Sequence, residues 1–144
     1  MAFTGDFMCT SFKQELLTAT HDFTLTTGSV FKIALYDNTP SFDASTTDYT
    51  ATNEVANGNG YTTGGATLTN VTPTTSGTTA YTDFADVTWS SASFTAYGAL
   101  IYNSTAGTNS VVILNFSGAQ TATNGDFVVQ FPAFDSTNAI IRIA

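Results

Sequence analysis

The chain has 144 residues, the length of one domain, and carries 11 acidic but only three basic side chains, giving a net charge of −8. With so few cations to neutralise phosphate groups, it is not expected to bind nucleic acid or an anionic membrane surface. Aromatic residues make up 13% of the sequence and charged residues 10%, a balance that excludes a disordered chain and indicates a packed core.

The N-terminal segment, residues 1–29, contains the one convincing helical pattern, which begins at Ser11. Phe12 and Leu16 lie one turn apart on the same helical face, and Ser11 with Gln14 matches a capping box. An amphipathic helix this short must pack against something. It either caps one end of a sheet or belongs to an arm that reaches a neighbouring subunit.

The middle of the chain alternates strand patterns with turn signals. Val30–Tyr36 is an alternating apolar run and predicts the first strand. A long loop follows, because Pro40 and the segment Asn57–Gly60 are turn formers. The next elements are predicted to be a strand, a turn and a strand, at Ala66–Thr72, Pro73–Thr79 and Tyr81–Trp89.

The strand at residues 81–89 is expected to be half-buried. Alternation of side chains along a strand places Ala85, Val87 and Trp89 toward the core. Asp83 has the same parity, but it lies near the start of the strand, where we expect its carboxylate to reach water.

The stretch Ser93–Asn103 is predicted to be the central strand, because both of its faces are largely apolar and such a strand is covered on both sides. Gly98 is the one position in it that lacks a side chain. This gap is expected to accommodate a large neighbour such as Trp89 or Phe116. Three more apolar runs predict the remaining strands, at Ser110–Phe116, Asp126–Phe131 and Ala139–Ala144.

The runs amount to about eight strands at short spacing with no helices between them. This pattern favours an all-β fold, an antiparallel β-sandwich of the jelly-roll-like kind, over alternating strand–helix units. We therefore expect a sandwich domain over residues 30–144, preceded by an N-terminal arm, residues 1–29, that carries the short helix.

No residue pattern indicates catalysis or metal binding. His21 is the only histidine; a nucleophile–base pair with Cys9 is one alternative, but a polar residue in the turn after the helix is the favoured interpretation. Asp37, Asp43 and Asp48 share one loop and could supply oxygens to Ca²⁺, yet they lack the spacing of a calcium loop and fit solvated turn residues. We expect no enzyme activity and no catalytic, cofactor-binding or metal-ligating residue.

Aromatic residues provide the remaining functional signal. Tyr49, Tyr61, Tyr81 and Trp89 lie at or near loop edges, where aromatic side chains either stack on sugars or pack in oligomer interfaces. Both alternatives stay open beside ordinary core packing. The residues expected at a partner surface are Phe3, Phe7, Phe12, Leu16, Tyr49 and Tyr61.

Targeting signals are not apparent in the sequence. No basic region precedes an apolar one at the N-terminus, so we expect no secretory signal peptide. No apolar run approaches the ~20 residues of a membrane helix. The protein is therefore expected to stay in a cytosolic compartment or to leave it by a route other than classical secretion.

Five segments, spread over nearly the whole chain, carry a family resemblance: MAFTGDFMCTSFKQELLTATHDF (residues 1–23), TGSVFKIALYDNTPSFDASTTDYTATNEV (residues 27–55), YTDFADVTW (residues 81–89), YGALIYNS (residues 97–104) and NAIIRIA (residues 138–144). Taken together they resemble a group of small structural proteins from tailed bacteriophages. No catalytic residues belong to that pattern. The resemblance implies a part in particle assembly.

Small all-β proteins of this size resemble capsid decoration (cement) proteins, which sit as trimers on the lattice of the major capsid protein. On this basis we expect a virion protein, assembled in the host cytoplasm, that contacts the major capsid protein or other virion proteins as a homo-oligomer, a trimer. One alternative is a tail, neck or fibre component. Another, of a different class, is a carbohydrate-binding module that uses Tyr61, Tyr81 or Trp89 for stacking.

Overall fold

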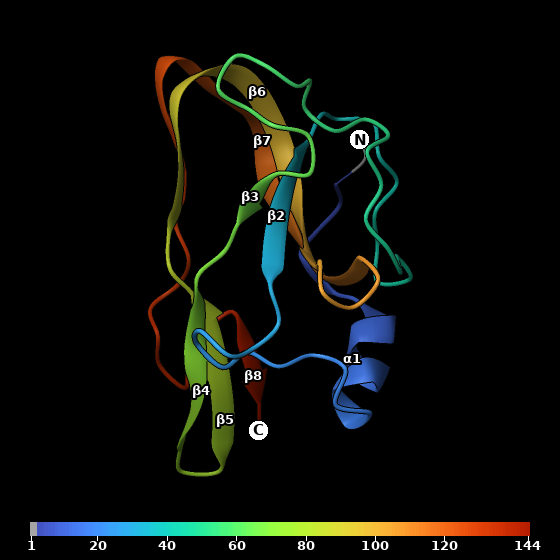
Figure 1. Cartoon of the computed structure of the whole chain (residues 1–144), viewed down its shortest axis with the longest axis vertical. Coiled ribbons are helices and arrows are strands. Elements are labelled where there is room, and N and C mark those ends of the chain that lie inside the picture. Colours follow the sequence, from blue (N-terminus) through green and yellow to red (C-terminus); the bar gives the residue numbers. More distant parts are fainter. Residues whose placement is uncertain (1–2) are drawn as a thin grey trace.

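The computed structural model describes residues 3–144 and contains two antiparallel sheets and one short helix (Figure 1). The expected all-β sandwich of about eight strands with a short helix is confirmed. Among the described residues, no helix has the length and apolar character needed to cross a bilayer. In chain order the elements are β1 (Phe7–Met8), α1 (Thr10–Leu17), β2 (Phe31–Tyr36), β3 (Ala66–Thr67), β4 (Asn70–Ser76), β5 (Thr79–Phe84), β6 (Val87–Asn103), β7 (Asn109–Val129) and β8 (Ile141–Ile143).

The larger sheet has the strand order β1-β7-β6-β2-β3, and the smaller sheet has the order β4-β5-β8. The predicted central strand is confirmed, because β6 occupies the middle of the larger sheet between β7 and β2. It starts at Val87, well before the predicted Ser93. The first predicted strand is confirmed as well, as β2, whose side chains are buried except for the half-buried Lys32.

Strands β6 and β7 form one long antiparallel ribbon, paired from Val87↔Val129 to Asn103↔Asn109. Two strands predicted at residues 110–116 and 126–131 are therefore a single strand, since the polar residues between them, which resemble a turn, also pair with β6. Several register shifts interrupt the ladder, and Ser117 has a positive φ of 59°. Such bulges bend a ribbon, and in Figure 1 this one curves over the end of the molecule opposite β4 and β5.

The prediction for residues 66–79 is wrong in its boundaries. The predicted strand Ala66–Thr72 is divided between the two sheets, because Leu68 is buried at the crossing and its N–H donates to the Phe31 carbonyl at 2.9 Å. The predicted turn after it is largely strand, since β4 continues to Ser76. Pro73 is tolerated because β4 is an edge strand, where a missing N–H needs no ladder partner.

The predicted strand Tyr81–Trp89 is also divided between the sheets. β5 ends at Phe84, and β6 begins at Val87 after two exposed residues. Asp83 does not reach water as predicted, because its side chain is only 1% exposed. Trp89 faces the core as predicted, whereas Ala85 is exposed at the crossing.

Helix α1 begins one residue earlier than predicted, and its start is not a capping box. The N-cap is Cys9, whose side chain makes no capping hydrogen bond, while the buried hydroxyl of Ser11 has no hydrogen-bond partner among the described residues. Tertiary contacts set the start: the Cys9 N–H donates to the Val111 carbonyl at 3.0 Å, and the Thr10 N–H donates to the Ala44 carbonyl at 2.7 Å. The predicted capping box is wrong because β7 and a distant loop hold this backbone instead.

Residues 3–29 share one hydrophobic core with the sandwich. β1 pairs with β7, and α1 packs against the same strand. The side chains of Phe3, Phe12 and Phe23 are buried among strand residues, and the Phe23 ring stacks on Phe31 with a centroid distance of 4.4 Å. In this structure the segment expected as an arm therefore lies on its own domain.

Gly98 in β6 makes room for Phe3. The prediction that Trp89 or Phe116 would fill this gap is wrong. A Cβ atom at Gly98 would lie 2.5 Å from Phe3 Cε1 and 2.6 Å from the Leu114 carbonyl oxygen. The predicted gap is thus present, but its occupant comes from the N-terminal segment. Pairing of β1 with β7 brings that segment to the centre of the larger sheet.

Candidate interaction surface

A groove of about 440 Å³ lies between the C-terminal half of α1 and the smaller sheet. We call it the α1–β8 groove. Apolar side chains form most of its wall, and Asp22 is the one charged residue on its exposed rim. Its lining consists of Leu16, Ala19, His21, Asp22, Phe23, Pro73, Ala80, Tyr81, Thr82, Ile141 and Ile143.

The sheet side of the groove follows from the register of β5 with β8. Ile143 pairs with Ala80, and Ile141 pairs with Thr82. Directly paired residues share a face of the sheet, so the two isoleucines present one apolar surface toward α1. Arg142 lies between them and reaches the other face, where its guanidinium donates to the Thr137 carbonyl.

The helix side of the groove follows from the amphipathic pattern of α1. Phe12 is fully buried, while Leu16, one turn later, is half-buried and borders the groove. Leu17 points away from the core and is 89% exposed. On the sheet side, Ile143 lines the groove and is 57% exposed, so a large apolar side chain of the groove reaches solvent.

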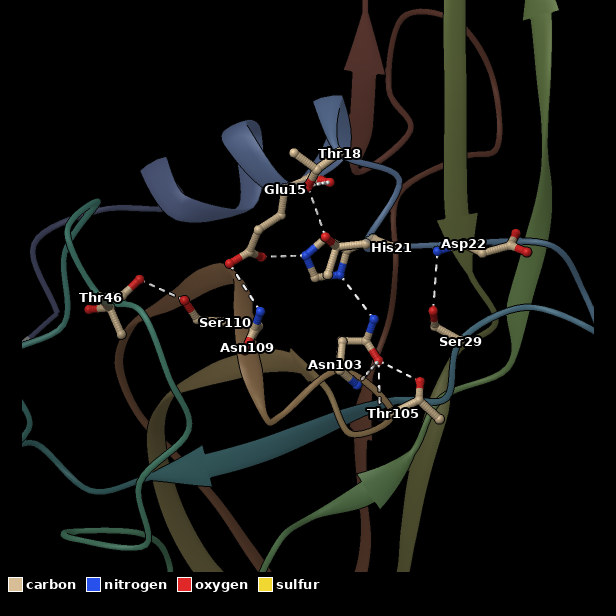
Figure 2. Close-up of polar contacts among 12 residues, drawn as sticks. Glu15, Thr18, His21, Asp22, Ser29, Thr46, Asn103, Thr105, Asn109 and Ser110 are labelled. Carbon is tan, nitrogen blue, oxygen red and sulfur yellow. Dashed lines mark hydrogen bonds and ion pairs between the residues drawn. The ribbon is translucent and has the colours of Figure 1, made fainter.

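Behind the groove, a buried hydrogen-bond network joins α1 to the β6–β7 turn (Figure 2). His21 Nε2 lies 2.5 Å from the Glu15 carboxylate, and the Asn103 amide nitrogen donates to His21 Nδ1 at 3.0 Å. The second Glu15 oxygen accepts from the Asn109 amide at 3.0 Å. The sequence separations, 82 residues for His21 with Asn103 and 94 for Glu15 with Asn109, explain why no local pattern predicted this network.

The orientation of Asn103 determines the tautomer of His21. Asn103 Oδ1 accepts from the Thr105 N–H, the Thr105 hydroxyl and the Ala106 N–H. Its amide nitrogen must therefore face His21, which makes Nδ1 an acceptor and leaves the proton on Nε2, directed at Glu15. Both ring nitrogens are engaged, so His21 acts in this structure as a buried polar residue that holds the turn after the helix.

Cys9 does not form a nucleophile–base pair with His21. Its side chain is fully buried and hydrogen-bonded to Ser110. Burial raises the pKa of the Cys9 thiol, the opposite of what an activated thiolate requires. The favoured interpretation of His21 as a polar turn residue fits the structure, and the alternative pair is wrong.

Three of the six residues expected at a partner surface lie in the core. Phe3, Phe12 and Tyr61 are at most 2% exposed, so packing within the chain uses the apolar area that we had assigned to a partner. The other three, Phe7, Leu16 and Tyr49, are half-buried, and their partner contacts stay a prediction. Of the six, Leu16 is the one that lines the α1–β8 groove.

From the sequence we named Tyr81 as a loop-edge aromatic residue, but we singled out neither Ile143, which lines the groove, nor Leu17, which is exposed on α1 outside the groove lining. Leu17 falls outside the apolar stripe of α1, which is a signal that the sequence does contain. Ile143 carried no such signal, because its exposure depends on β8 lying at the edge of its sheet.

The aromatic residues proposed for sugar stacking are mostly enclosed. Tyr61 donates its hydroxyl to Glu54 at 2.6 Å and accepts from the Leu35 N–H at 2.9 Å. Trp89 is 7% exposed and stacks on Tyr61 with a centroid distance of 6.1 Å. Tyr81 is half-buried and packs against Phe134. Neither Tyr61 nor Trp89 presents a free ring face for a sugar.

The aspartates of the 37–48 loop make the local contacts of turn residues. Asp37 accepts from the Thr39 N–H and Asp43 from the Ser45 N–H, both at 2.7 Å. Across residues 3–144, no three His, Cys, Asp or Glu side chains gather in an arrangement that could hold a metal ion. The interpretation as turn aspartates is confirmed for Asp37 and Asp43, whereas Asp48 forms an isolated β-bridge with Asn109.

Fold and surface together define a small all-β sandwich whose marked surface feature is an apolar groove beside its helix. Comparison of the chain with protein-family models, with curated proteins and with solved structures finds no match.

Proposed function

We propose that the chain is a non-enzymatic structural protein of a tailed-bacteriophage particle, most specifically a decoration (cement) protein on the outside of the head. It would bind the major capsid protein or other virion proteins and act as a homo-oligomer in many copies. The segments that resemble phage structural proteins supply the class. The α1–β8 groove is the observation that carries the assembly role.

The groove supports assembly because it combines exposed apolar groups with an apolar recess. Ile143 lines it and is 57% exposed, in a chain whose remaining surface is rich in polar side chains. Contiguous exposed apolar surface of this kind is typical of protein interaction sites. The polar groups beside it are engaged internally, since both ring nitrogens of His21 and both oxygens of Glu15 have partners.

Many weak contacts act together when a protein binds a lattice in many copies. A decoration protein therefore needs a stable scaffold and a docking surface, but no tight pocket for a small ligand. The sandwich core supplies such a scaffold, and the groove supplies such a surface.

The copy number in purified particles tests this proposal. Quantitative mass spectrometry should find the chain at on the order of hundreds of copies per particle, because a decoration protein follows the symmetry of the whole head lattice. The major capsid protein in the same sample serves as the internal standard.

About three to twelve copies would instead match a component on the symmetry axis of a tail, neck or fibre. That count would overturn decoration and leave a structural role. Absence of the chain from the particles would overturn the virion assignment as a whole.

A further inference from the structure

We propose that Asn59 is a site of spontaneous chemical modification, at which the folded chain converts its own asparagine to aspartate and isoaspartate with water as the co-reactant. This property goes beyond the proposed particle role and does not depend on it. The sequence contains three Asn-Gly dipeptides, at residues 57–58, 59–60 and 124–125. The structure leaves the reacting groups of the second one free and holds those of the other two.

The reaction begins between the backbone nitrogen of the glycine and the side-chain carbonyl carbon of the asparagine. Hydroxide takes the glycine N–H proton, the nitrogen bonds to Cγ, and the Cγ–Nδ2 bond breaks, so that Nδ2 takes a proton from water and leaves as ammonia. Glycine favours this step because it has no Cβ to crowd the attack and its backbone is flexible. The product is a cyclic succinimide, and no group is oxidised or reduced.

Water then opens the succinimide by adding to either of its carbonyl carbons and breaking that carbon's bond to the ring nitrogen. Addition at Cγ leaves an aspartate side chain on an ordinary backbone. Addition at the backbone carbonyl leaves isoaspartate, in which the chain runs through the former side chain and is longer by one carbon atom. Either product carries a carboxylate where the chain had a neutral amide.

At Asn59-Gly60 both reacting groups are free. The Asn59 side chain is exposed and forms no hydrogen bond with any residue from 3 to 144. The Gly60 N–H likewise donates to no acceptor in that part of the chain. The Asn59 carbonyl accepts from the Ser93 N–H at 2.9 Å, but this oxygen takes no part in ring closure. The attacking nitrogen and the attacked amide are therefore both available.

The preceding dipeptide, Asn57-Gly58, is held at both reacting groups. The Gly58 N–H donates to the Tyr61 carbonyl at 2.8 Å. Asn57 Oδ1 accepts from the Thr63 N–H at 3.2 Å, which fixes the side-chain amide. Ring closure here requires both contacts to open, and each one that must open lowers the population of reactive conformers. Adjacent dipeptides of identical composition are thus expected to differ in reactivity.

The third dipeptide, Asn124-Gly125, is held by the β6–β7 ribbon. The Asn124 N–H donates to Ser93 Oγ at 2.9 Å, and the Ser93 hydroxyl donates to Asn124 Oδ1 at 3.2 Å. Gly125 lies in the antiparallel ladder opposite Ala92. The side-chain carbonyl and the strand backbone are both fixed, so this dipeptide is also protected.

Isoaspartate at Asn59 would loosen the turn from β6. Gly60 packs closely on that strand, since a Cβ atom at Gly60 would lie 2.9 Å from Ala92 Cα. A backbone lengthened just before Gly60 cannot keep this contact without a shift. Tyr61, the next residue, is 2% exposed and its hydroxyl accepts from the Leu35 N–H, so the shift would reach the core.

Mass-spectrometric mapping of the folded chain during incubation at mildly alkaline pH tests the assignment. Replacement of the amide NH2 by OH should appear at Asn59 about ten-fold faster or more than at Asn57 and Asn124, which are internal controls in the same sample. The rate at Asn59 should rise with hydroxide concentration. In guanidinium chloride the three sites should react at similar rates, because the protecting hydrogen bonds are lost.

Two results of this mapping would overturn the assignment. One is a folded chain in which Asn57 or Asn124 reacts as fast as Asn59. The other is a folded chain in which Asn59 stays intact over a period that modifies it in the unfolded chain.

Thermal unfolding of aged samples tests the effect on the turn. The wild-type chain should lose stability in step with the isoaspartate content at Asn59, measured with an isoaspartate-specific methyltransferase. Asn59→Gln should not, because its longer side chain closes the ring less readily, and Asn57→Gln is the matched control that should age like wild type. Each protein is compared with its own fresh sample, since glutamine suits the positive φ of 52° at this position less well than asparagine does. Equal loss of stability in wild type and Asn59→Gln would show that Asn59 does not control the turn.

Discussion

Asp83 is buried between β5 and the segment that leads into β8, and its surroundings favour the neutral acid. Desolvation by burial raises the pKa of this carboxyl, and Asp86 adds a smaller effect in the same direction. Hydrogen bonds from the Phe84 and Ile140 N–H groups oppose the shift without cancelling it. Ionised Asp83 therefore costs the folded state free energy at neutral pH.

Asp83→Asn should change how stability depends on pH. Because the folded-state pKa lies above the ordinary value of 3.8, the contribution of Asp83 to stability is present below that value and is lost as the pH rises through the folded-state pKa. The free energy of unfolding of Asp83→Asn, relative to wild type, should therefore increase over this pH range. Urea denaturation at several pH values measures it.

The lowered pKa values of Asp22, Asp43 and Asp135 affect both proteins equally and cancel in this difference. If the difference in free energy of unfolding between Asp83→Asn and wild type stays constant from acidic to neutral pH, Asp83 is solvated in the folded protein.

Gly98 is the second residue whose environment leads to a prediction. Gly98→Val should lower the free energy of unfolding by about 1–3 kcal/mol or more, because the added side chain would collide with the Phe3 ring and the Leu114 carbonyl. Chemical denaturation provides the measurement. Gly125→Ala is the control in the same ribbon, since its nearest atom, the Thr123 carbonyl oxygen, is 3.7 Å away. Equal stability of both variants would refute the close packing of Phe3.

At the scale of elements, α1 is held by polar groups as well as by its apolar face. It is only eight residues long, too short to persist on its own. Phe12 packs on the core, while Glu15 and His21 connect the helix to Asn103 and Asn109 at the β6–β7 turn (Figure 2). The position of the groove wall therefore depends on this network.

Asn103→Ala should destabilise the protein and loosen α1. The change leaves Nδ1 of the buried His21 ring without a partner, which costs about 1–3 kcal/mol, and removes the acceptor of the Thr105 and Ala106 N–H groups. Hydrogen exchange of the α1 amides should accelerate together with the loss of global stability. Asn138→Ala is the matched control, because Asn138 is exposed and bonds to its near neighbour Asp135. Unchanged exchange in α1 would mean that apolar packing alone holds the helix.

The β6–β7 ribbon shows how one long element forms most of the larger sheet. Its bulges let it pair with β2 near the β6–β7 turn and bend away beyond Gly98. The break between the two predicted strands, at residues 117–125, follows from composition, since Ser, Gly, Thr and Asn are turn formers. These residues continue the strand because their partners in β6 lie opposite them, a relation that local composition does not contain.

At the scale of the whole molecule, assembly depends on surfaces that folding leaves uncovered. Burial of Phe3, Phe12 and Tyr61 removes them from the predicted partner surface, whereas Leu17 and Ile143 remain exposed. Aromatic content therefore predicted a core correctly but did not predict which large apolar side chains stay exposed. The proposed particle role rests on the α1–β8 groove.

The sequence by itself determined the all-β class, the strand at Val30–Tyr36, the central position of Ser93–Asn103 and the apolar face of α1. These features follow from the period of apolar residues within a few positions, which a single sequence displays directly. The loop aspartates lack the spacing of a calcium loop, and this too can be read directly from the local sequence.

Tertiary structure alone decided which sheet each half of Ala66–Thr72 and Tyr81–Trp89 joins, why Asp83 is buried, and where His21 finds its partners. It also decided that Ile143 lines the groove and stays 57% exposed. The physical reason is common to all of them: each depends on contacts between segments far apart in the chain, and long-range packing overrides local preference wherever the two compete.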